Sequence, residues 1–87
     1  MQLRYLQTDE AMNRVLLAPV RKYGTAVSRN RARRIARESY RLMKHQLRQG
    51  FDLAFVLYHD ADTLPNRSHQ MLTVLQRAGL LLEERKE

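Results

Sequence analysis

Five arginines lie within nine residues of this 87-residue chain. They are Arg29, Arg31, Arg33, Arg34 and Arg37. The only acid beside them is Glu38, which directly follows the last arginine. A guanidinium group is planar, is always charged and donates two parallel hydrogen bonds to a phosphate. This spacing therefore indicates the binding of a polyanion, and it offers no acid or base for catalysis.

The positive charge of the chain comes from one block. Residues 11–48 hold eleven Lys and Arg and one acid, whereas the rest holds five bases and eight acids, and the net charge is +7. A one-signed block is the electrostatic footprint of a nucleic-acid-binding surface. An anionic membrane surface and an acidic protein are alternative partners. A solvated helix face without a ligand is the simplest interpretation, but such faces usually mix both signs of charge.

A long helix must carry these arginines, and its pattern predicts residues 26–49, with Thr25 as the N-cap and Gly50 as the stop. At about 100° per residue the segment divides into two faces. The apolar face holds Ala32, Ile35, Ala36, Ser39, Leu42, Met43 and Leu47. The basic face holds Asn30, Arg31, Arg33, Arg34, Arg37, Arg41, Lys44 and Arg48. Since like charges at i,i+4 repel, the basic face lowers stability and indicates a ligand.

The other elements form a small sheet and a second helix. Residues 3–8 and 14–20 are predicted strands, and Pro19 in the second indicates a sheet edge or a bulge. Residues 51–60 are apolar on both sides, as in a central strand that is covered on at least part of both faces. A last helix starts near Asp62 or Thr63. Its apolar stripe is Met71, Val74, Leu75 and Ala78.

The order β-β-α-β-α predicts a single α+β domain over residues 1–87, a small α/β sandwich with both helices packed on one sheet. Residues 82–87 are expected to form a frayed tail. No apolar run approaches the roughly 20 residues that a membrane helix needs. We therefore expect a cytoplasmic protein with no membrane partner.

Catalytic and metal-binding patterns are not found. The chain has no cysteine, its three histidines share no ligand spacing, and neither a nucleophile–base pair nor a carboxylate pair stands out. We therefore expect no catalytic residue, no metal ligand and no cofactor bound by the protein alone. DNA is not expected either, because no short helix precedes the basic one to form a helix-turn-helix.

The segment "GTAVSRNRARRIARE", residues 24–38, resembles the signature of a known family, the protein component of bacterial ribonuclease P. The match consists of a turn glycine, Ala-Val, Arg-Asn-Arg, a basic pair and Arg-Glu in that order. "GFDLAFVLYHDA" and a final helix also follow the family layout. Family members usually begin with an additional helix and strand, whereas this sequence starts near what looks like the family's second strand. We therefore expect either a fragment that does not start at the natural first residue or a shortened member of the family.

This resemblance implies a function. It implies an RNA-binding subunit of a ribonucleoprotein endoribonuclease, which assists a catalytic RNA in removing the 5′ leader from precursor tRNA. The RNA then performs the hydrolysis with Mg²⁺, and the protein supplies no catalytic side chain. It also implies a left-handed βαβ crossover, and a cleft between the basic helix and the sheet for the single-stranded leader. The alternative is a general RNA-binding or ribosome-associated module with no part in cleavage.

The residues expected to bind RNA follow from the basic face and the turn before it. They are Arg21, Lys22, Arg29, Asn30, Arg31, Arg33, Arg34, Arg37 and Arg41. Arg29 lies at the edge of the apolar face and must reach out from the first helical turn. Tyr23 is a candidate for stacking on a base, although a buried aromatic at a turn is the alternative. Glu38 is expected to pair with Arg31, Arg34 or Arg41.

Overall fold

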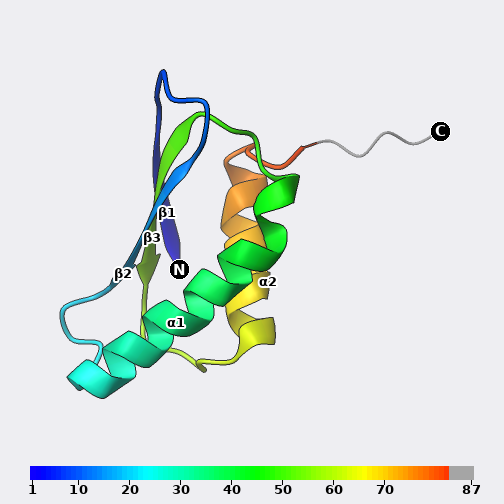
Figure 1. The fold of residues 1–87 in the computed structure, drawn as a ribbon. Helices are drawn as coiled ribbons and strands as arrows, with labels where there is room; N and C mark the ends of the chain where they lie inside the picture. Colours follow the sequence, from blue (N-terminus) through cyan, green and yellow to red (C-terminus); the bar gives the residue numbers. More distant parts are fainter. Residues whose placement is uncertain (83–87) are drawn as a thin grey trace.

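The computed structural model describes residues 1–82, with the elements in the predicted order (Figure 1). The elements are β1 Gln2–Gln7, β2 Arg14–Pro19, α1 Ala26–Met43, η1 Lys44–Gln46, β3 Phe51–Leu57 and α2 Leu64–Arg77, where η1 is a 3₁₀ turn. The expected α+β architecture, with two helices on one small sheet, is confirmed.

The sheet has the order β1-β3-β2, so β3 is the central strand, as predicted. It pairs antiparallel with β1 and parallel with β2. β2 is an edge strand, which agrees with Pro19 at its end, because proline has no N–H for a second neighbour. β2, α1 and β3 therefore form a βαβ unit, in which α1 connects two adjacent parallel strands.

The core lies between the sheet and the two helices. Leu53, Phe55 and Leu57 alternate along β3 and are at most 3% exposed. α1 meets them with residues that include Ala32 and Ala36, both fully buried. Such small side chains let the helix approach closely, and the burial of apolar surface is the main stabilising term.

α1 and α2 lie side by side and run in the same direction (Figure 1). Ser68 Oγ donates to Ser39 Oγ at 3.0 Å, and Ser39 is fully buried. This pair gives each buried hydroxyl a partner where the helices touch. Thr63 caps α2, since its Oγ1 accepts from the Asn66 N–H at 3.3 Å.

The predicted end of the long helix is wrong by about six residues. α1 ends at Met43, and η1 then turns Leu47 into the core, where it is 2% exposed. The backbone beyond η1 pairs with residues 80–82, with Arg48 N–H donating to the Leu80 carbonyl at 2.8 Å. Leu42, assigned to the apolar face, is 48% exposed, although the next residue, Met43, is 4% exposed.

Only one face of β3 is covered within residues 1–82, whereas cover on both was predicted. The side chains of Ala54 and Asp52 point away from the helices, on the face shared with Leu16 and Arg14. Of the predicted frayed tail, residues 83–87 lie outside the described part of the chain. Leu82 is bound, since its N–H donates to the Gln46 carbonyl at 2.8 Å. Neither helix described has the length and apolar character that crossing a bilayer requires.

Candidate nucleic-acid interface

The start of α1 is fixed by a tight turn and a side-chain cap. Gly24 has φ of +120°, a conformation that side chains with a Cβ rarely adopt. Thr25 Oγ1 accepts from the Ser28 N–H at 3.1 Å, as the sequence predicts for an N-cap. Arg29 Nη1 donates to the Arg21 carbonyl at 3.4 Å, so this arginine holds the turn against the helix.

The arginines of the basic face project outward from α1. Arg31, Arg34, Arg37 and Arg41 are exposed, whereas Arg33 is half-buried and donates from Nη1 to Asn30 Oδ1 at 3.2 Å. The structure brings these residues onto one helix face, next to the exposed Arg21 and Lys22 of the turn. Lys44 and Arg48 lie beyond the end of α1, Lys44 as its C-cap. These two remain exposed.

Almost none of this charge is neutralised within residues 1–82. The one acid on the face, Glu38, pairs with Arg41, with Nη2–Oε1 at 2.5 Å and Nε–Oε2 at 2.9 Å. This hydrogen-bonded pairing lowers the pKa of the Glu38 carboxyl and raises that of the Arg41 guanidinium. Arg31, Arg34 and Arg37 form no ion pair with any described acid. Their charge is therefore free for a ligand.

A buried polar cluster, the Tyr23 cluster, lies behind the start of α1 and consists of Tyr23, Asp62 and Arg67. The Tyr23 hydroxyl donates to Asp62 at 2.8 Å and accepts from Arg67 Nη2. Arg67 is fully buried and also donates to Asp62 Oδ1 at 2.9 Å, to Gln70 Oε1 at 2.9 Å and to the Tyr58 carbonyl at 3.0 Å. The cluster joins the turn before α1 to the β3–α2 loop and to α2.

Of the two alternatives for Tyr23, stacking on a base or burial at the turn, the structure shows burial. It is 1% exposed and its ring packs against His59 with centroids 5.4 Å apart, so stacking on a base is excluded in this conformation. The burial raises the pKa of the Tyr23 hydroxyl, and the hydrogen bond to Asp62 adds to the shift. Sequence reasoning missed Arg67, although one signal was present, since it lies one turn before Met71 on the apolar stripe of α2.

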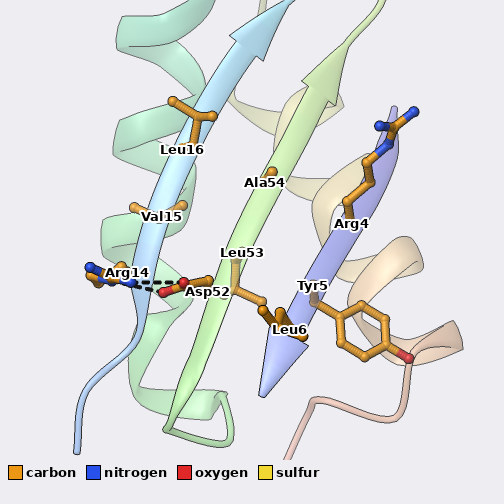
Figure 2. Close-up of a pocket in the computed structure, with 9 residues that line it drawn as sticks. All are labelled: Arg4, Tyr5, Leu6, Arg14, Val15, Leu16, Asp52, Leu53 and Ala54. Carbon is orange, nitrogen blue, oxygen red and sulfur yellow. Dashed lines mark hydrogen bonds and ion pairs between the residues drawn. The ribbon is translucent and has the colours of Figure 1, made fainter. Parts of the chain in front are cut away.

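A hollow lies on the side of the sheet that the helices leave open. This open face carries Arg4, Leu6, Arg14, Leu16, Asp52 and Ala54 (Figure 2). Its cavity has a volume of about 430 Å³. Leu6 and Leu16 are 68% and 62% exposed, so much of the surface is apolar. Arg14 binds Asp52 through two contacts of 2.8 Å, which lowers the pKa of that carboxyl.

This position corrects the expected cleft between the basic helix and the sheet. The space between α1 and the sheet is filled, since Ala36 is fully buried and the rings of Tyr40 and Phe55 lie 6.2 Å apart. The hollow instead lies on the far face of the sheet, where only strands contribute to it.

Comparison with known proteins decides the family. The family model described as Ribonuclease P matches residues 1–79. The chain belongs to this family. A ribonuclease P protein component from a Thermoanaerobacter species is 34% identical over 73 residues, which cover 78% of this chain and 63% of that protein. The component from Symbiobacterium thermophilum is 38% identical over 73 residues, covering 82% and 64%.

Solved ribonuclease P proteins share the fold. The RNase P protein of Staphylococcus aureus superposes with a TM-score of 0.77 at 21% identity, over 91% of this chain and 74% of that chain. The protein from Thermotoga maritima gives 0.76 at 22% identity, over 86% and 74%. The chain spans about 63% of the length of the Thermoanaerobacter relative, so the alignment leaves part of that ribonuclease P protein unmatched.

In this ribonuclease P chain, the exposed residues that were predicted to bind RNA lie together at the turn before α1 and along α1. Arg21 and Lys22 lie in the turn between β2 and α1, and the arginines of the basic face follow along the helix. The open face is a separate surface on the other side of the sheet.

Proposed function

We propose that this chain is an RNA-binding subunit of ribonuclease P, which assists a catalytic RNA in removing the 5′ leader from precursor tRNA. The observation that carries the proposal is the row Arg31, Arg34 and Arg37. These arginines are exposed and have no acidic partner among residues 1–82, in a chain of the Ribonuclease P family. An RNA backbone supplies the counter-charge that the protein lacks.

The basic face of α1 is the surface for the catalytic RNA. Its side chains make phosphate contacts, and arginine suits them because its planar fork bonds two oxygens at once. The residues in this role are Arg29, Asn30, Arg31, Arg33, Arg34, Arg37 and Arg41. Arg21 and Lys22 extend the contact across the turn. Each neutralised phosphate releases counterions, so that binding weakens steeply with salt.

The open face is the surface for the single-stranded 5′ leader. A leader without secondary structure offers unstacked bases and phosphates, and this face presents both kinds of partner. Leu6 and Leu16 offer apolar area for bases, and Arg4 offers a charge for phosphate. The register places Arg4 and Leu16 on either side of Ala54, whose small side chain leaves room between them (Figure 2).

Hydrolysis belongs to the RNA in this proposal, and the Mg²⁺ that supports it is held there. Within residues 1–82 no three His, Asp or Glu side chains lie together as a protein metal site requires. The protein's contribution is electrostatic, because it lowers the repulsion between the catalytic RNA and the precursor. The site of action is the cytoplasm, where tRNA precursors are processed.

Reconstitution tests the proposal. A bacterial ribonuclease P RNA is combined with this chain at low Mg²⁺, and cleavage of a precursor tRNA is followed. The parent should accelerate cleavage, and a variant with Arg31, Arg34 and Arg37 changed to alanine should not. If the parent binds the RNA without any acceleration, the chain is a general RNA-binding module. If the parent fails to bind, the assignment of the basic face is wrong.

A further inference from the structure

A second pocket lies on the outer side of α1, at the point where the start of α2 approaches it. Its lining residues are Arg31, Arg34, Ile35, Glu38 and Leu64, and its volume is about 430 Å³. Four of them share one face of α1 at the spacing i, i+3, i+4 and i+7. Leu64 is the first residue of α2, and it sits one turn before the contact between Ser68 and Ser39.

The floor of the pocket is apolar. Ile35 is half-buried and Leu64 is 36% exposed, so each side chain leaves part of its hydrocarbon surface in water. The part of each side chain that remains exposed lines the pocket. A flat, apolar ligand would remove this surface from water, which is favourable in proportion to the area covered.

The rim of the pocket carries both signs of charge in a fixed arrangement. Arg31 and Arg34 have no acidic partner among the described residues, and they suit the phosphates of a strand that passes over α1. Glu38 is held by Arg41 and stays ionised, because the pairing lowers its pKa. A carboxylate repels phosphate and only accepts hydrogen bonds, so it suits an amino group of a base.

We infer that this α1–α2 pocket takes one unstacked purine of the RNA bound by the basic face, with its ring on Ile35 and Leu64 and its amino group on Glu38. The inference rests on the proposed function and deepens it. A purine covers more of the floor than a pyrimidine, and adenine and guanine both carry an exocyclic amino group. A base inside a duplex is stacked on both sides and cannot enter, so the nucleotide belongs to a loop, bulge or junction.

The test separates a base contact from a phosphate contact. The affinity of the chain for a bacterial ribonuclease P RNA is measured over a series of salt concentrations, for the parent and for Leu64→Ser. The variant should bind about 5- to 10-fold more weakly at every salt concentration, with an unchanged slope of log K against log[salt], because a leucine neutralises no phosphate. Arg34→Ala should instead reduce the slope by nearly one unit.

Two further variants act as controls. Leu64→Met keeps an apolar floor and should bind like the parent, and an unchanged circular dichroism spectrum of Leu64→Ser excludes a loss caused by misfolding of α2. Met12→Ser removes a different exposed apolar side chain, 73% exposed in the β1–β2 loop at the other end of the sheet, and should leave affinity unchanged (Figure 1). If Leu64→Ser binds like the parent, or if Met12→Ser loses as much affinity, the pocket is not a base site. A parent that does not bind the RNA contradicts the proposed function instead.

Nucleotide-level probing identifies the base. Chemical footprinting should reveal one purine that the parent protects and Leu64→Ser leaves reactive. Replacing that nucleotide by an abasic one should cost the parent at least the factor that the leucine substitution costs, because the contacts with Ile35 and Glu38 are lost as well, and the two changes together should cost less than the product of their separate factors. Independent, multiplying losses would mean that the base and Leu64 do not touch, and the inference would be wrong.

Discussion

The Tyr23 cluster predicts that Asp62 is among the residues whose loss destabilises the chain most. Arg67 is fully buried, and the side chain of Asp62 is 14% exposed, so the two charges interact largely away from water. Asp62→Ala leaves the guanidinium inside the protein without a counter-charge. Burial of an unpaired charge is costly, even where neutral acceptors remain.

The expected cost follows from these contacts. Breaking a buried ion pair by removing one partner costs about 3–5 kcal/mol. Gln70 Oε1 and the Tyr58 carbonyl still accept from Arg67, and Asp62 is not fully buried. These contacts place the loss at about 2–4 kcal/mol, a large part of the total of about 4–13 kcal/mol expected for a chain of this length. At about 4–8 °C per kcal/mol, Tm should fall by at least about 8 °C.

Urea unfolding followed by circular dichroism measures this loss, and the chain offers a matched control. Asp52 also binds an arginine, Arg14, through two contacts, but on the exposed face of the sheet. Because water screens that pair, Asp52→Ala should leave the midpoint nearly unchanged. A double change of Asp62→Leu with Arg67→Met should cost less than Asp62→Ala alone, since no charge is then left buried. Equal shifts for Asp62→Ala and Asp52→Ala would refute the reasoning.

Three further predictions concern stability. Sulfate added at fixed ionic strength should raise Tm, because it supplies negative charge to the basic face. The triple variant with Arg31, Arg34 and Arg37 changed to alanine should lose most of this rise. An unchanged melting curve of the parent would contradict the prediction. The pKa of Tyr23 is raised in the folded state, so the free energy of unfolding should fall as pH rises above about 10, the ordinary pKa of tyrosine. Urea unfolding at a series of alkaline pH values measures this fall, and Tyr23→Phe should make it smaller. Thr25→Ala should cost about 1 kcal/mol through the lost cap, measured by urea unfolding, and no loss would show that the cap hydrogen bond is not needed.

Local chemistry was sufficient to predict the order of elements. The cap at Thr25, the turn at Gly24 and the central strand β3 each depend on residues close together in the chain, and all three are confirmed. The clean division of α1 into an apolar and a basic face followed from the helical period alone. These features have local causes, so a single sequence contains them.

Long-range contacts decided what the sequence did not predict. The helical pattern continues to Leu47, but α1 ends at Met43 because residues 46–48 pair with residues 80–82, more than thirty positions away. The apolar residues of β3 on the open face gave no sign of which face the helices would cover. The Tyr23 cluster joins three distant segments, and only Arg67 on the apolar stripe of α2 hinted at it. The α1–α2 pocket likewise depends on a long-range contact, because Leu64 of α2 must lie beside α1.

The most direct test of the central claim is the salt dependence of binding to a bacterial ribonuclease P RNA. Two variants each lose three arginines and so have the same net charge. One changes Arg31, Arg34 and Arg37 of α1 to alanine, and the other changes Arg14, Arg48 and Arg77, which are exposed and lie outside α1. The slope of log K against log[salt] should fall by about 2–3 in the first variant and stay near the parent's in the second. Equal slopes in the two variants would contradict the claim that α1 is the RNA-binding surface.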